Sequence, residues 1–358
     1  MMQFNPARLE LAMDRRRFTA RALAELADVT VVSLSQIKTG KQLPQETTIR
    51  RIADALEYPP EFFYGNDFDT LPAEAVSFRS LSSVTQRERN AAIAAGGIAY
   101  LVSDWLHSKY TLPKANFVDA SPERDPATAA RALRQTWSLG EKPISNLIKL
   151  LESKGIRVFS LAENTKNVDA FSCWRNDEPF IFLNTFKTTE RSRFDAAHEL
   201  GHLVLHKHGG SNQGLQAEAE ANAFASSFLM PLADVISEMP RAHSLKQILH
   251  GKKRWGVSAA ALTYRLHKIG LITDWQYRTF NIQLRSAFKN SEPDSMARET
   301  STLWKMVLED LWGQKLTRAD IAKELNIPHG ELENLLFGLT ASSDHPPSKN
   351  SNVKLSLV

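Results

Sequence analysis

Cysteine is almost missing from this sequence, because Cys173 is the only one among 358 residues. An intrachain disulfide is therefore excluded, and a reducing cytoplasm is the simplest setting for the chain. Long apolar runs are missing too, so the sequence predicts neither a transmembrane helix nor a membrane partner. The first residues lack the apolar segment of a secretory signal, which agrees with a cytoplasmic protein.

A strong charge imbalance and a phosphate-binding glycine loop are also missing. The formal net charge is only +4, which permits a polyanionic partner without demonstrating one. We find no internal repeat. The length suffices for about two or three domains with cores of their own.

What the sequence does contain is the pattern H-E-x-x-H, in a segment with helical periodicity. His198 and His202 are four residues apart, so both imidazoles project from one face of the helix, one turn apart. That geometry can hold two corners of a zinc tetrahedron, and Glu199 can serve as general base. The alternative is a surface helix with two unrelated histidines.

The next predicted helix offers a third ligand. Glu218 opens it, and Asn222 follows one turn later. A catalytic zinc needs three protein ligands and an open position. Glu220 is the rival third ligand but lacks a polar residue four positions on. His206 shares the face of the two histidines; it is expected either to pack beside them or to polarise a substrate carbonyl.

Together these two segments read F-D-x-x-H-E-L-G-H-x-x-x-H and E-x-x-A-N-x-F-A-x-x-F-L-M-P. They resemble the ImmA/IrrE family of zinc metallopeptidases, over roughly residues 145–270. The resemblance implies a zincin-like minimal core that binds Zn2+ through His198, His202 and Glu218, with Glu199 as the catalytic base. Asn222 is then expected to orient a histidine ligand.

The N-terminal region reads as five short helices with a tight turn between the second and third. From Thr19 to Pro44 it runs T-x-x-x-L-A-x-x-x-D-V-T-x-x-x-x-S-x-I-x-T-G-K-x-x-P, which resembles the lambda-repressor-like XRE class of helix-turn-helix proteins. This class usually has Gly where Asp28 stands, and Asp tolerates a left-handed turn better than most residues. It often has Gln near Ala20, so the usual contact at that position is in doubt.

In this motif the second helix enters the major groove of double-stranded DNA by its N-terminal residues. The resemblance places Thr30, Ser33 and Gln36 against bases or phosphates, and Lys41 against a phosphate. Arg15, Arg16 and Arg17 either add backbone contacts or form a solvated cluster. The alternative for the whole module is a helical protein-interaction domain.

We expect a mainly α fold with a small β-sheet, an α+β arrangement. Strands are expected at 156–161, 169–174 and 179–184, the last two forming a hairpin that turns at 175–178. Residues 316–339 resemble one more helix-turn-helix. The expected order is a helix-turn-helix domain (1–66), a linker (67–89), a metallopeptidase domain (90–290), a C-terminal helical domain (291–340) and a disordered tail (341–358).

The sequence therefore predicts a transcription regulator, expected as a homodimer on an operator, that carries a zinc endopeptidase. The family resemblance implies cleavage of a helix-turn-helix repressor, or of the chain itself, in a stress, mobile-element or phage-defence switch. The alternative is a DNA-binding repressor or antitoxin whose zincin domain only senses a ligand or partner.

Overall fold

The computed structural model describes residues 3–67, 69–71, 85–117, 125–161, 170–206, 214–289 and 291–340. The expected tail at 341–358 lies outside these described residues, as does most of the expected linker. Contacts divide the chain into two compact units. The first is Met1–Leu112, Phe159–Val168 and Leu303–Val358, and the second is Pro113–Val158 and Asp169–Thr302. Among the described residues, no helix combines the length and apolarity needed to cross a membrane.

The first unit begins with the five short helices that the sequence predicts. They are α1 (Pro6–Arg15), α2 (Ala20–Leu26), α3 (Val31–Lys38), α4 (Glu46–Leu56) and the 3-10 helix η1 (Pro60–Tyr64). Thr19 and Thr30 cap α2 and α3 through their side chains. Their shared core is apolar and fully buried, and it includes Leu9, Leu23, Leu34, Ile37, Ile52, Leu56, Phe62 and Phe63.

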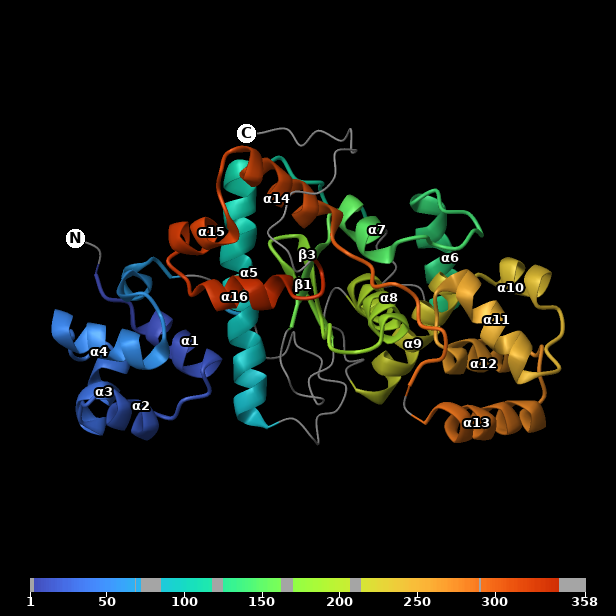
Figure 1. Cartoon of the computed structure of the whole chain (residues 1–358), viewed down its shortest axis with the longest axis horizontal. Coiled ribbons are helices and arrows are strands. Elements are labelled where there is room, and N and C mark those ends of the chain that lie inside the picture. Colours follow the sequence, from blue (N-terminus) through green and yellow to red (C-terminus); the bar gives the residue numbers. More distant parts are fainter. Residues whose placement is uncertain are drawn as a thin grey trace. The chain divides into compact units, whose positions relative to one another are not determined.

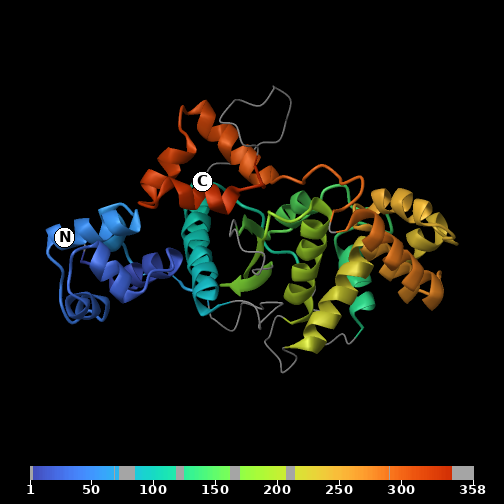
Figure 2. The same cartoon turned by 60° about the horizontal axis from the view of Figure 1, so that its bottom comes forward.

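The long helix α5 (Gln86–Lys109) belongs to the same unit as these helices. A capping box between Thr85 and Glu88 starts it, and α1 packs against it. The C-terminal helices of the same unit are α14 (Thr302–Gly313), α15 (Arg318–Glu324) and α16 (His329–Leu336). Both views show α16 crossing α5 (Figure 1, Figure 2).

Two members of the arginine cluster, Arg15 and Arg16, have a different role from either one expected. The buried carboxylate of Glu331 on α16 accepts hydrogen bonds from Arg15 Nε at 2.6 Å and from Arg16 Nη1 at 2.5 Å. These two guanidinium groups are therefore neither solvated nor directed at phosphate. They attach the C-terminal helices to the N-terminal ones.

The second unit holds most of the sheet, because only the last two residues of β1 belong to the first unit. It begins with α6 (Pro126–Thr136) and α7 (Leu147–Ser153), followed by β1 (Arg157–Ser160), β2 (Phe171–Arg175) and β3 (Glu178–Leu183) in the order β1-β3-β2. β2 and β3 form the expected antiparallel hairpin, with Phe171 opposite Phe182. Asn176 and Asp177 form its turn with φ of 48° and 63°, a backbone these residue types tolerate.

Behind the sheet lie the two helices that carry the site, α8 (Thr189–Leu205) and α9 (Leu215–Leu229). α8 packs against β2 and β3 on one side and against α9 on the other (Figure 1). The unit continues with α10 (Leu232–Glu238), α11 (Leu245–Trp255), α12 (Ala259–Lys268) and α13 (Asp274–Phe288). The expected fold class, mainly α with a small sheet, is confirmed.

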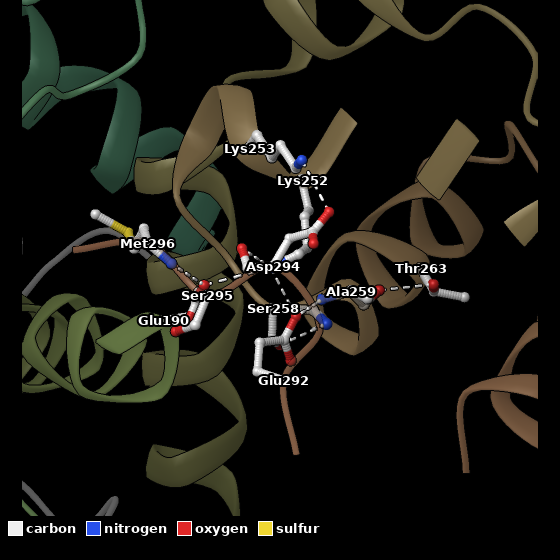
Figure 3. Close-up of polar contacts among 11 residues, drawn as sticks. Glu190, Lys252, Lys253, Ser258, Ala259, Thr263, Glu292, Asp294, Ser295 and Met296 are labelled. Atoms are coloured by element: carbon white, nitrogen blue, oxygen red, sulfur yellow. Dashed lines mark hydrogen bonds and ion pairs between the residues drawn. The ribbon is translucent and has the colours of Figure 1, made fainter. Parts of the chain in front are cut away.

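A buried ionic cluster fixes the first turn of α8. Glu190 accepts hydrogen bonds from Ser295 Oγ at 2.7 Å and from the Met296 amide at 2.8 Å (Figure 3). Lys252 lies between two carboxylates, its Nζ 3.3 Å from Glu190 and 3.0 Å from Glu292. The segment after α13 is thereby tied to α8 and α11.

Residues 295–301 are not helical, and Glu299 in this segment binds Arg193 of α8 and accepts a hydrogen bond from the Leu147 amide. The α7 helix begins at Leu147, where the Asn146 side chain caps it. Thr188 occupies the position before α8 but makes no side-chain cap bond.

Candidate metal centre

The two histidines of α8 face each other across one helical turn. Their Nε2 atoms are 3.0 Å apart. His198 is almost fully buried and His202 is 13% exposed, so the pair stands at the edge of the core rather than on the open surface.

Glu218 reaches the same point from the first turn of α9. Its Oε2 lies 3.3 Å from His198 Nε2, and its Oε1 lies 3.4 Å from His202 Nε2. Gly201 permits this approach: a Cβ there would stand only 3.2 Å from Ala221 Cα and 3.1 Å from the Phe224 ring. The missing side chain lets α9 come close enough for a glutamate to meet both histidines.

The hydrogen bond of His198 to Asn222 sets its tautomer. His198 Nδ1 is 3.1 Å from Asn222 Oδ1. Because an amide oxygen only accepts, Nδ1 donates the proton, and the lone pair of Nε2 faces Glu218 and His202.

Two successive hydrogen bonds, from Glu220 through His206, set the tautomer of His202. Glu220 Oε2 lies 2.9 Å from His206 Nε2, and His206 Nδ1 lies 3.1 Å from His202 Nδ1. A carboxylate accepts, so His206 donates from Nε2 and accepts at Nδ1 from His202. His202 Nε2 then carries a lone pair. Burial lowers the pKa of His206 despite its bond to Glu220, which favours this neutral ring.

Glu199 is buried beside the cluster and held by a strand. Ser172 Oγ of β2 donates to Glu199 Oε2 at 2.8 Å. Burial raises the pKa of Glu199, although the nearby histidines and Ser172 oppose the effect. Sequence reasoning missed Ser172, because a serine within a short strand belongs to no motif.

The donor set fits a catalytic zinc. The ligand atoms of His198, His202 and Glu218 all lie within 4.8 Å of one another. Two imidazole nitrogens and one carboxylate oxygen are a ligand set of catalytic zinc sites, and tetrahedral bonds of about 2.1 Å place donors about 3.4 Å apart.

In the N-terminal helices, the four expected DNA contacts fall into two groups. Gln36 and Lys41 are exposed, on α3 and just after Gly40. Thr30 is exposed, but its hydroxyl accepts the Ser33 amide at 3.1 Å, and Ser33 is half-buried on the side of the helix. Asp28 adopts the left-handed backbone expected of it, with φ of 51°.

Comparison with known families identifies both modules. Residues 151–267 match the model of a peptidase family described as the IrrE N-terminal-like domain, and residues 7–61 match the model of a helix-turn-helix domain. The chain thus joins a region similar to a helix-turn-helix domain to a region similar to the IrrE N-terminal-like peptidase domain, which is the fusion that the sequence predicts. A comparison with curated proteins gave no match.

Proposed function

We propose that this protein is a DNA-binding regulator whose second unit is a zinc endopeptidase. The observation that carries the proposal is the convergence of His198, His202 and Glu218 beside the buried carboxylate of Glu199. The match to a peptidase family supports the same reading.

Each residue of this site would have a distinct role in hydrolysis of the peptide bond. His198, His202 and Glu218 would hold Zn2+, which, when bound, activates a water and polarises the scissile carbonyl. Glu199 takes the proton of the attacking water and passes it to the leaving amine. Ser172 holds the carboxylate in place.

The strand that carries Ser172 suggests where the substrate lies. β2 stands at one end of the strand order, and Ser172 brings it next to Glu199. We place an extended peptide along this strand, because strands recognise exposed main chain rather than folded helix. The proposed substrate is an extended segment of a helix-turn-helix repressor or of this chain itself.

The helix-turn-helix domain would bring this activity to an operator. Gln36 and Lys41 are exposed where a recognition helix meets bases and phosphate. We propose a homodimer on two half-sites. The limits 1–66, 90–290 and 291–340 are our proposal for its functional parts, and they differ from the two compact units, in which α5 and the C-terminal helices share the first unit.

One observation favours the second candidate, a repressor whose zincin domain only senses a ligand or partner. Glu199 is only 4% exposed, and Ser172 occupies one of its oxygens. A base so enclosed fits a latent site that opens on a signal.

Incubating zinc-loaded protein with repressors encoded by neighbouring genes distinguishes the two. Cleavage by the wild type, with none by Glu199→Gln at equal zinc content, supports the peptidase. Equal behaviour of the two proteins, with and without inducing ligands, supports the sensor.

A further inference from the structure

The outward face of the recognition helix α3 carries a valine at its centre. Leu34 and Ile37 are fully buried and fix the rotation of the helix. Val32 consequently points the opposite way, with 68% of its surface exposed. Ser35 and Gln36 are also exposed, and they lie three and four residues further along, on the same face as Val32.

This face has no side chain that reads guanine well. Arginine or lysine makes the commonest specific contact to guanine. The only cation in α3 is Lys38, and its Nζ is 2.8 Å from Glu10 Oε1 of α1. Lys38 also lies about 120° around the helix axis from Val32, so the face around Val32 presents only apolar and neutral polar groups.

The same face has two groups suited to A·T pairs. Apolar side chains pack on the C5 methyl group of thymine, and glutamine bonds to N6 and N7 of adenine. Val32 supplies the first type of group and Gln36 the second, one turn apart on an exposed surface. Ser33, one of the positions that the sequence pattern suggested, lies half-buried to the side.

We propose that α3 reads A·T pairs in the major groove, with Val32 contacting a thymine methyl group and Gln36 an adenine. The inference rests on the DNA-binding part of the proposed function and adds the base preference. Val32 is then a specificity-determining residue.

The test replaces single methyl groups on the DNA. The full chain first selects its preferred duplex from a random pool. Each thymine of that duplex is then replaced by deoxyuridine, which pairs identically but lacks the methyl group, and Kd is measured at one salt concentration. For the wild type, at least one replacement should weaken binding about 3- to 10-fold, the scale of one buried methyl group.

Two protein variants, Val32→Ala and a matched control, are measured on the same thymine and deoxyuridine duplexes. Val32→Ala should bind the thymine duplex about 3- to 10-fold more weakly, and the deoxyuridine penalty at that position should vanish. Leu26→Ala removes a similarly exposed apolar side chain, 60% exposed at the end of α2, and should keep the full penalty. Melting curves verify that each variant is folded.

Two results would overturn the inference. If no thymine replacement weakens wild-type binding, or if the penalty is equal in Val32→Ala, then Val32 reads no thymine while DNA binding itself stands. If the chain selects no sequence at all, the proposed operator binding fails as well.

Discussion

At the scale of the single residue, the carboxylates of Glu218 and Glu220 lie next to different histidines of the same cluster. Glu218 lies near both Nε2 atoms, whereas His206 is the one histidine that Glu220 contacts, and His206 in turn contacts His202. The carboxylate of Glu220 thus acts through two rings. It fixes the tautomer of His202 without reaching the point where the lone pairs converge.

This difference predicts two sizes of effect on zinc affinity. Glu218→Ala removes a ligand and should abolish tight binding. Glu220→Ala frees the two rings and should weaken zinc binding about 10- to 100-fold, while saturating zinc still fills the site. Competition with a chromophoric chelator measures both constants.

Leu215→Ala is the matched control, because it changes a 93% exposed side chain on the same helix and should leave zinc affinity unchanged. If Glu220→Ala abolished binding while Glu218→Ala preserved it, the ligand assignment would be reversed.

At the scale of the element, α8 depends on the buried cluster at its first turn. Lys252 and Glu190 are both 1% exposed, and Glu292 is 13% exposed. Removing the cation leaves two buried carboxylates facing each other. Lys252→Met should therefore lower the free energy of unfolding by about 3–5 kcal/mol. Urea unfolding followed by circular dichroism measures the loss.

The adjacent lysine provides the control. Lys253 pairs with Asp294, but both side chains are more than half exposed, so Lys253→Met should leave stability nearly unchanged (Figure 3). Equal losses from the two substitutions would show that the cluster does not stabilise α8.

The same cluster predicts an acid-sensitive contribution to stability. Burial alone would raise the pKa of Glu190, but bonds from Ser295 and Met296 lower it below 4.5, its ordinary value. A carboxyl group with a lowered pKa stabilises the fold above its ordinary pKa and loses this effect as the pH falls through the lowered value. The wild type should therefore become less stable below pH 4.5, and the dependence should be weaker in Glu190→Gln.

Local patterns predicted the elements well because their causes are local. The spacing of His198 and His202 follows from helix geometry, and Asn176-Asp177 turns the hairpin because both residues accept a positive φ. The contact of Ser172 with Glu199 could not be predicted, because it depends on how β2 packs on α8. Whether Ser33 or Val32 faces outward depends on how the short helix α3 is rotated about its axis. Neighbouring residues differ by about 100° around a helix, so the sequence alone did not decide it.

At the scale of the whole molecule, residues far apart in sequence set the organisation. Glu331 and Arg16 are separated by 315 positions, and no local pattern pairs them. Through this contact, a helix-turn-helix-like C-terminal segment packs into the fold. Its second helix, α16, packs against α5 and has Leu332, Leu335 and Leu336 buried.

Because of this contact, we expect that a substitution of Glu331 destabilises α1 and α16 together. Glu331→Ala leaves two arginines facing a buried gap and should destabilise both α1 and α16, by about 3 kcal/mol. Hydrogen exchange should rise in both helices together. Glu324→Ala breaks the half-exposed pair with Lys109 and should change exchange little. Faster exchange in α16 alone would contradict the link.

The central proposal is that Glu199 acts as the general base when this protein cleaves a peptide bond beside a bound zinc. Its most direct test labels all new protein N-termini in cells under an inducing stress, comparing wild type with a chromosomal Glu199→Gln strain. Zinc content of the two purified proteins should be equal, since Glu199 is not a ligand. The account predicts a new N-terminus, within a repressor or within this chain, that falls about 100-fold or more in the variant. Identical N-termini in both strains, with the target genes induced equally, would contradict it.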